Sequence, residues 1–275
     1  ARRLRGTSVY LDIISVGATI QVMLAASLAE GTTVIQNCAR EPHVVAVANF
    51  INACGGKVTG AGTDTIRVRG VERLVGATHT VIPDDIEAGT WMMAAAMTQG
   101  DVTLQNVIPT HITPIIAKLR EAGVEIHELG DAVRVIGRGR PKAINVKTLP
   151  YPGFPTDAQS QMTAMLSLAE GTSYVTETLY EDRFRFVPEL VRMGAEIRVE
   201  GRTAIVKGVE RLYGAPVEAT DIRAGAALVI AGLAAEGETT IYGMEHVQRG
   251  YEKLEQKLLA LGADAKMQRQ GAAVV

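Results

Sequence analysis

Asp157 is the residue whose surroundings point most clearly to chemistry. It follows the segment "PYPGFPT" (150–156), which contains three prolines and one glycine, and it precedes an apolar run with helical periodicity. A carboxylate at this place can cap the free amides of a helix that begins here. It can also act as a general base that a rigid turn holds in position. The stretch by itself favours the cap, so the rest of the chain has to decide between the two roles.

The remaining residue types that could do chemistry suggest no metal centre and no disulfide. The five histidines lie far apart and have no metal-ligand spacing, so we predict no metal site. Cys38 and Cys54 are the only cysteines among 275 residues, and they are more simply two reduced thiols than one bridge.

Composition places the chain among ordinary globular proteins. Apolar residues make up 47% and charged residues 21%, and the formal net charge is −2. This balance gives no reason to expect nucleic acid or an anionic membrane as the main partner. No apolar run approaches the roughly 20 residues that a membrane-spanning helix needs. The first residues, "ARRLRG", lack the apolar stretch of a signal peptide, so we expect a cytoplasmic protein.

The elements that must position Asp157 come from an internal repeat of about 70 residues. Two glycine-containing joins recur four times each and keep the same period. The first join is "LAEGTTV", "TQGDVTL", "LAEGTSY" and "AAEGETT", with glycines at 31, 100, 171 and 237. The second is "CGGKV", "AGVEI", "MGAEI" and "LGADA", with glycines at 55, 123, 194 and 262. Each repeat therefore reads as helix, glycine cap, strand, helix, glycine cap and two short strands.

The two helices of a repeat differ in composition. The first is rich in Ala, Met and Leu on nearly every face, as in "AGTWMMAAAMTQG" (88–100), and this predicts burial on all sides. The second carries a charged face, as in "HITPIIAKLREAG" (111–123), and should contact solvent. We therefore predict a compact α/β body with pseudo-symmetric repeats, buried helices and outer sheets.

A series of motifs in this order resembles the UDP-N-acetylglucosamine enolpyruvyl transferases. The motifs are "ISVGATI" (14–20), "AREPHVV" (39–45), "GAGTDTIRV" (60–68), "YPGFPTDAQSQ" (151–161), "TETLYEDRFRF" (176–186), "ATDIRAGAALV" (219–229) and "QRGYEKLEQKL" (248–258). The resemblance implies an inside-out α/β barrel without a cofactor. It also implies transfer of the enolpyruvyl group of phosphoenolpyruvate to the 3-hydroxyl of UDP-N-acetylglucosamine with release of phosphate, the first committed step of peptidoglycan synthesis.

The resemblance also implies a division of the chain. Residues 1–81 look like the last repeat of the domain on the UDP-sugar side, and residues 82–275 look like a three-repeat domain that carries the catalytic aspartate and the phosphoenolpyruvate-binding arginines. The chain then matches the C-terminal two thirds of the family. The preceding part, with its catalytic cysteine loop, is expected to be absent, and neither Cys38 nor Cys54 matches that cysteine.

Catalytic roles follow from the same resemblance. Asp157 matches the family aspartate that contacts the 3-hydroxyl and acts as base. The resemblance therefore favours the role of general base over that of helix cap. Arg183, Arg223 and Arg249 match arginines whose planar forks suit the carboxylate and phosphate of phosphoenolpyruvate. Asp221 is expected to orient Arg223 or to cap its helix.

The substrate-binding residues implied on the sugar side begin with the start of a helix. Ser15, Val16 and Gly17 offer free amides suited to a diphosphate, with Ile13 and Ile14 before them. Many family members have lysine in place of Ile13, and isoleucine cannot make that charged phosphate contact. Thr156 belongs to the same implied site, and so does Leu179, whose backbone matches a contact to the N-acetyl group.

Alternatives from other classes stay open. The chain could be a non-catalytic remnant that binds nucleotide sugar, or it could act on shikimate 3-phosphate, as the sister enolpyruvyl transferase does. Because missing repeats would expose apolar helix faces and unpaired strands, we also expect self-association or a complementing chain.

Overall fold

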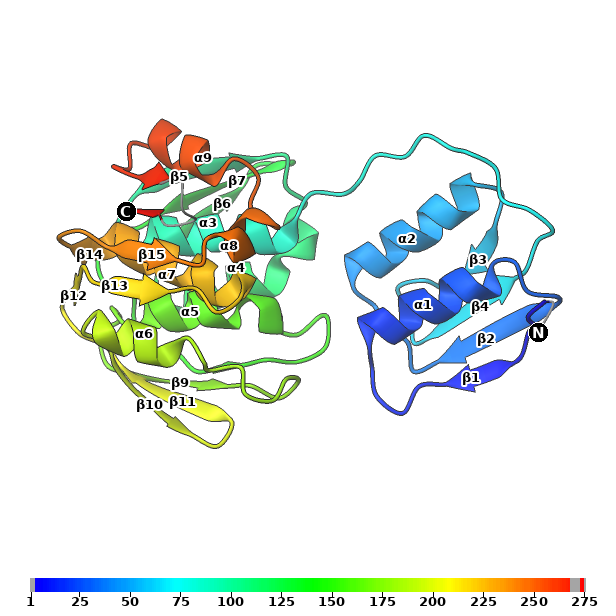
Figure 1. The fold of residues 1–275 in the computed structure, drawn as a ribbon, viewed down its shortest axis with the longest axis horizontal. Coiled ribbons are helices and arrows are strands. Elements are labelled where there is room, and N and C mark those ends of the chain that lie inside the picture. The colour runs from blue at the N-terminus through cyan, green and yellow to red at the C-terminus, as the bar shows by residue number, and fades with distance from the viewer. Residues whose placement is uncertain (1–2, 268–272, 275) are drawn as a thin grey trace. The chain divides into compact units, whose positions relative to one another are not determined.

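The computed structural model describes residues 3–267 and 273–274, and these divide into two compact units. Unit 1 comprises residues 1–83 together with 150–152, and unit 2 comprises residues 84–149 and 153–275. Figure 1 labels the elements of each unit. The assignment of the units to the two domains of the enolpyruvyl transferases remains a prediction.

Unit 1 is a sheet with helices on one face (Figure 1). Its helices are α1 (Val16–Ala26) and α2 (Pro42–Ala53), and its strands are β1 (Ser8–Tyr10), β2 (Thr32–Gln36), β3 (Lys57–Thr59) and β4 (Thr65–Arg69). The strand order is β1-β2-β4-β3, with β1 parallel to β2 and the other pairs antiparallel. Met23, Ile35, Val44 and Ile66 are fully buried between helices and sheet.

Unit 2 contains three successive repeats. The first has α3 (Asp85–Met97), β5 (Asp101–Gln105), η1 (Pro109–His111), α4 (Thr113–Glu121), β6 (Glu125–Glu128) and β7 (Ala132–Ile136). The second has β8 (Val146–Lys147), η2 (Thr156–Ala158), α5 (Gln159–Leu166), β9 (Thr172–Thr176), α6 (Val187–Arg192), β10 (Glu196–Glu200) and β11 (Thr203–Lys207). The third has β12 (Leu212–Tyr213), β13 (Pro216–Glu218), α7 (Ile222–Ala234), β14 (Ala235–Glu236), β15 (Thr240–Tyr242), α8 (Glu245–Gln248), α9 (Leu254–Ala260), β16 (Lys266–Met267) and β17 (Ala273–Val274).

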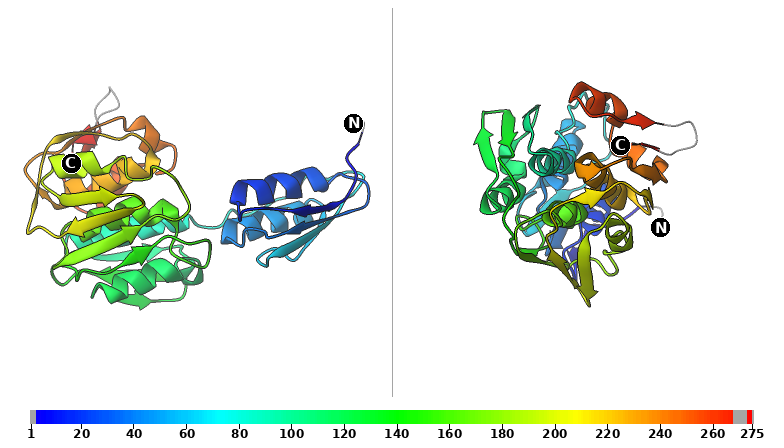
Figure 2. Two further views of the ribbon diagram at one scale, coloured as in Figure 1. Left: turned by 90° about the horizontal axis from the view of Figure 1, so that it is seen from below. Right: turned by 90° about the vertical axis from the view of Figure 1, so that its left-hand side faces the viewer.

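The first helix of each repeat lies inside unit 2. Helices α3, α5 and α7 pack against one another, and all eight residues of α5 are buried. The sheets β5-β7-β6, β8-β9-β11-β10 and β13-β15-β17-β16 lie toward the outside, as Figures 1 and 2 show. The predicted α/β architecture with buried helices and outer sheets is confirmed for unit 2.

Helix α1 differs from this prediction, which expected burial on all sides. Among its residues only Thr19, Met23 and Ala26 are buried, and Leu24 is exposed. The reason is that unit 1 contains a single repeat. Its described residues give α1 the neighbours α2 and a sheet, whereas each buried helix of unit 2 also packs against two others. Leading strands β1, β8 and β13 were not predicted either, because each has only two or three residues.

One glycine contact repeats in both units and explains part of the sequence period. The glycine after the last strand of a repeat donates its N–H to the carbonyl of the glycine that ends the first helix, at 2.9 Å each time. The pairs are Gly70 with Gly31, Gly137 with Gly100, and Gly208 with Gly171. A Cβ atom on Gly208 would lie 1.6 Å from the carbonyl oxygen of Ala169, so no larger residue fits this close approach.

Candidate active site

Asp157 lies between two arginines in unit 2. Its Oδ1 accepts a hydrogen bond from Nη2 of Arg183 at 2.7 Å, and its Oδ2 accepts one from Nη2 of Arg223 at 2.9 Å. The two arginine side chains are each 19% exposed, and that of Asp157 is 42% exposed. Both bonds join opposite charges, so they are stronger than neutral hydrogen bonds. Two cations around one anion leave an excess positive charge that suits an anionic ligand.

The interpretation of Asp157 as a helix cap is wrong. In neither the turn η2 nor helix α5 does a backbone amide donate to a capping side chain, and the N-cap residue of α5 is Ala158. The chain enters α5 through a 3-10 turn, and the two carboxylate oxygens are bonded to arginines instead of helix amides. The Asp157 side chain is therefore held by two arginines that come later in the chain, Arg183 and Arg223.

The backbone of Arg223 is fixed by Asp221, which is the N-cap of α7. Oδ1 of Asp221 accepts from the amides of Arg223 at 2.7 Å and Ala224 at 2.9 Å. Burial lowers the pKa of the Arg223 guanidinium, but the charge of Asp157, the hydrogen bond to Asp157 and the charge of Asp84 outweigh it, and the net shift is upward. Arg223 is consequently a permanent cation at this site.

A buried polar cluster lies behind Arg223. The hydroxyls of Tyr251 and Thr90 are 2.8 Å apart, and Nε2 of Gln161 donates to Thr90 at 3.1 Å and to Tyr251 at 3.3 Å. Burial raises the pKa of the Tyr251 phenol, which stays neutral beside Arg223. The sequence analysis gave Tyr251 no role. Its place in the motif "QRGYEKLEQKL", two residues after Arg249, was the signal that could have found it.

Arg249 is not joined to this cluster by a side-chain contact. It follows α8 as the C-cap residue and is exposed, and its guanidinium has no hydrogen bond or ion pair with the described residues. In the sequence, Arg249 is two residues before Tyr251, which belongs to the cluster. Its role as a phosphoenolpyruvate ligand stays a prediction.

The predicted diphosphate site lies at the start of α1 in unit 1. Ser15 is the N-cap residue, and its Oγ accepts from the amide of Ala18 at 3.2 Å. The amides of Val16 and Gly17 belong to the first turn, where helix N–H groups have no partner within the helix. Ile13 and Ile14 are both exposed just before it.

Thr156 and Leu179 both contact Glu177, a residue that the sequence analysis did not single out. Oγ1 of Thr156 donates to Oε2 of Glu177 at 2.8 Å, and the amide of Leu179 donates to Oε1 at 2.8 Å. Of the two backbone groups of Leu179, the carbonyl is therefore the one that could accept a hydrogen bond from an N-acetyl group.

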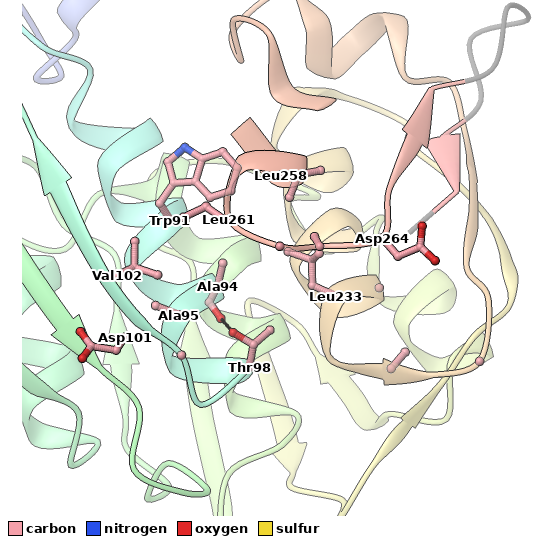
Figure 3. Close-up of a pocket in the computed structure, with 16 residues that line it drawn as sticks. Trp91, Ala94, Ala95, Thr98, Asp101, Val102, Leu233, Leu258, Leu261 and Asp264 are labelled. Atoms are coloured by element: carbon pink, nitrogen blue, oxygen red, sulfur yellow. Dashed lines mark hydrogen bonds between the residues drawn. The ribbon is translucent and has the colours of Figure 1, made fainter. Parts of the chain in front are cut away.

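A groove of about 500 Å³ elsewhere in unit 2 does not fit the predicted substrates (Figure 3). It lies between the C-terminal parts of α3, α7 and α9, and its lining includes Trp91, Leu233 and Leu258. Its charged lining residues, Asp101 and Asp264, are both acidic. Oxygens of Asp101 already accept from Arg134 at 2.8 and 2.6 Å. An acidic and apolar lining is a poor site for phosphate.

Both cysteines are free and buried, and burial raises the pKa of the Cys38 thiol. Within residues 3–267 and 273–274, no group of three or more His, Cys, Asp or Glu side chains could hold a metal ion. In that same part of the chain, no helix combines the length and apolarity that crossing a membrane requires.

Comparisons with known proteins agree with the motifs. UDP-N-acetylglucosamine 1-carboxyvinyltransferase 3 of Symbiobacterium thermophilum is 94% identical over 275 residues, which are 100% of this chain and 65% of that protein. A protein of the same name from Caldanaerobacter subterraneus is 58% identical and aligns over 96% of this chain and 63% of its own length. The chain thus spans somewhat less than two thirds of these relatives.

Among solved structures, the enolpyruvyl transferase NikO from Streptomyces tendae matches with a TM-score of 0.84 and 28% identity, over 96% of this chain and 66% of that chain. EPSP synthase from Acinetobacter baumannii matches in fold, with a TM-score of 0.71, 24% identity, and coverage of 94% of this chain and 63% of that one. The family model of EPSP synthase (3-phosphoshikimate 1-carboxyvinyltransferase) matches residues 1–258. These matches confirm the predicted resemblance and fold: the chain belongs to the EPSP synthase family and has the fold of the enolpyruvyl transferases.

Proposed function

We propose that the protein that carries this chain transfers the enolpyruvyl group of phosphoenolpyruvate to the 3-hydroxyl of UDP-N-acetylglucosamine and releases phosphate. The observation that carries the proposal is the Asp157 carboxylate held between Arg183 and Arg223. The names of the relatives support the nucleotide sugar as acceptor.

Asp157 is the base in this proposal. The reaction needs a group that removes the proton of the sugar hydroxyl as its oxygen attacks C2 of phosphoenolpyruvate, and an acid that protonates C3. Elimination then breaks the bond between C2 and the phosphate oxygen and returns one proton from C3 to the acid, which restores the double bond, and the proton taken from the sugar hydroxyl leaves with the released phosphate. A carboxylate has about four lone-pair sites, so Asp157 can contact a hydroxyl while it binds both arginines. The acid is not assigned to a residue of this chain.

The two arginines hold the phosphoenolpyruvate anion. Each uses Nη2 on Asp157, and the remaining N–H groups of Arg183 and Arg223 can bind carboxylate or phosphate oxygens. Arg249 supplies a third cation. Asp221 keeps Arg223 at the first turn of α7.

The sugar nucleotide is bound by backbone groups. Amides of Ser15, Val16 and Gly17 take the diphosphate, next to Ile13 and Ile14, because the start of a helix attracts anions. The carbonyl of Leu179 takes the N-acetyl N–H, and Thr156 stands beside the base. The wider role is in the cytoplasmic synthesis of peptidoglycan, and hence in cell-wall formation, cell shape and division.

The test is phosphate release from phosphoenolpyruvate in the presence of UDP-N-acetylglucosamine or shikimate 3-phosphate. Release with the nucleotide sugar alone is expected. Release with shikimate 3-phosphate alone would favour the second candidate, which the description of the matched family model supports. No release, with calorimetric binding of UDP-N-acetylglucosamine, would identify a binding remnant and overturn the transferase.

Self-association is part of the proposal for the isolated chain. Leu24 is exposed on α1, and an apolar helix face of this kind favours contact with another copy or with a complementing chain. Light scattering of the purified chain should give more than one copy per particle. A monomer that stays monomeric as concentration rises would contradict this.

A further inference from the structure

We propose that Glu177 is a positioning residue that holds both Asp157 and Arg183 in their working places; the inference rests on the proposed function of those two residues. Glu177 follows β9, and it is 1% exposed. A buried carboxylate is costly unless hydrogen bonds or an ion pair compensate for the lost water. A carboxylate buried at this place therefore needs a specific set of hydrogen-bond partners.

The partners of Glu177 are four neutral donors. Oε1 accepts from Oγ1 of Thr148 at 2.8 Å, from the amide of Leu179 at 2.8 Å and from the amide of Tyr180 at 3.0 Å. Oε2 accepts from Oγ1 of Thr156 at 2.8 Å. Both carboxylate oxygens therefore have hydrogen-bond partners, three donors on Oε1 and one on Oε2, and Glu177 brings these donors to one point.

These donors come from different segments, and two of the segments carry the site. Thr156 immediately precedes Asp157. Tyr180 precedes Arg183 by three residues, and the guanidinium carbon of Arg183 lies 5.0 Å from the centre of the Tyr180 ring. Glu177 is thus linked to Asp157 through Oε2 and Thr156, and to Arg183 through Oε1 and Tyr180.

Thr148 anchors the arrangement to the sheet. It follows β8, its Oγ1 accepts from the amide of Thr178 at 2.9 Å, and its carbonyl accepts from Oγ1 of Thr178 at 2.5 Å. The backbone of Thr148 and Phe154 also forms an isolated bridge, which closes the proline-rich segment before Asp157. Thr148 therefore links the ends of this segment to the carboxylate of Glu177.

Side-chain chemistry makes the proposal specific. Alanine at 177 would leave buried donors without an acceptor. Glutamine keeps one carbonyl oxygen for the amides of Leu179 and Tyr180, but it presents an NH2 group to Thr156, whose hydroxyl must then accept. Glu177→Gln should therefore retain part of the function that Glu177→Ala loses.

The experiment compares variants of the protein that carries this chain. Because misplacement by about 1 Å can cost about 100-fold in rate, we expect Glu177→Ala to lower kcat by about 100-fold and Glu177→Gln to lower it by about 10-fold. Glu181→Gln is the matched control, because its side chain belongs to the same loop and is 90% exposed. Its kcat should stay within about 2-fold of the parent.

A double variant separates positioning from general damage. If Glu177 acts through Asp157, adding Glu177→Ala to Asp157→Asn should lower the rate by much less than it does in the parent, while the losses in thermal midpoint add. Full multiplication of the two rate losses would overturn the proposal. Parent-like kcat in Glu177→Ala would overturn it as well.

Two further measurements keep the inference testable if Glu177→Ala does not fold or if the parent is inactive. Thr156→Val removes the hydroxyl that Glu177 binds, and Thr156→Ser restores it; the serine variant should recover most of the rate. Amide hydrogen exchange at Leu179 and Tyr180 should quicken in Glu177→Gln, because the neutral amide oxygen accepts their hydrogen bonds more weakly than a carboxylate does, and exchange in α7 should not change. An inactive parent with this exchange pattern would reject the proposed function alone, and unchanged exchange would reject the role of Glu177.

Discussion

Asp157 and Arg223 are joined by a hydrogen bond of 2.9 Å although they are 66 residues apart in the sequence. The repeat explains their meeting. Asp157 lies just before α5 and Arg223 lies in the first turn of α7, so they occupy the N-terminal ends of two buried helices that pack together. Helix N-termini carry a partial positive charge, which adds to the arginines and makes this end of the bundle favourable for anions.

Asp157→Asn tests the proposed base. Asparagine has nearly the same shape but cannot take a proton, so we expect kcat/KM for phosphate release to fall by about 1000-fold or more. The matched control is Asp182→Asn, which makes the same change in an exposed pair with Arg185. An Asp157→Asn variant with more than about a tenth of the parent rate would rule out Asp157 as the base.

Arg223→Lys and Arg183→Lys test the forked anion site. Lysine keeps the charge but loses the planar pair of donors, so KM for phosphoenolpyruvate should rise by about 10- to 100-fold in each variant. Arg185→Lys, in an exposed pair, should leave KM unchanged. Steady-state phosphate release at varied phosphoenolpyruvate checks this. Equal KM values in all three variants would argue against a role of the cluster in binding.

The fold was largely predictable because glycines mark the ends of its elements. The interval between these joins predicted the repeats, and the composition of the first helices predicted their burial in unit 2. For α1 the same composition misled, because burial of a helix depends on how many neighbours surround it. A single repeat does not supply the neighbours that α3, α5 and α7 give one another.

The site was predictable only in part. The motif pattern predicted Asp157, Arg183 and Arg223 as site residues, and the structure brings the three together, but the partners of Asp157 depend on which helix ends meet. Glu177 was missed because a glutamate at the end of a strand ordinarily faces solvent. Its burial is compensated by donors on two other segments, and that tertiary arrangement cannot be deduced from local sequence alone.

Gly208→Ala tests the close contact that repeats through the fold. A Cβ atom there would lie 1.6 Å from the backbone oxygen of Ala169, and backbone cannot move aside as a side chain does. We expect a loss of about 1–3 kcal/mol in the free energy of unfolding, measured by chemical denaturation. Gly76→Ala is the control, because a Cβ atom added to Gly76 would meet nothing within 4 Å. Equal stability of the two variants would contradict the packing explanation.

Thiol chemistry tests whether either cysteine could be reactive. Cys38 and Cys54 are both buried, which shields them from reagents, and burial raises the pKa of Cys38, so little of the Cys38 thiolate forms near neutral pH. We expect no rapid alkylation of the native chain by iodoacetamide and alkylation of both residues after unfolding, counted by mass spectrometry. For Cys38 the native rate should rise only at pH above its ordinary pKa. Fast stoichiometric labelling at pH 7 would show an activated thiol instead.

The buried phenol of Tyr251 should make stability depend on alkaline pH. Because burial raises its pKa in the folded state, the folded chain holds this proton more tightly than the unfolded chain, whose tyrosines ionise near about pH 10. The contribution of this phenol to the free energy of unfolding is therefore complete below about pH 10 and is lost as the pH rises toward the folded-state pKa.

Tyr251→Phe removes the hydroxyl bonds to Thr90 and Gln161, and it should cost about 1 kcal/mol at pH 8. Urea denaturation of parent and variant at several pH values should show this difference shrinking above about pH 10, because only the parent has the phenol to ionise. A difference that stays constant to pH 11 would mean that Tyr251 does not titrate with unfolding, and the phenol would then not be the neutral neighbour that Arg223 is inferred to have.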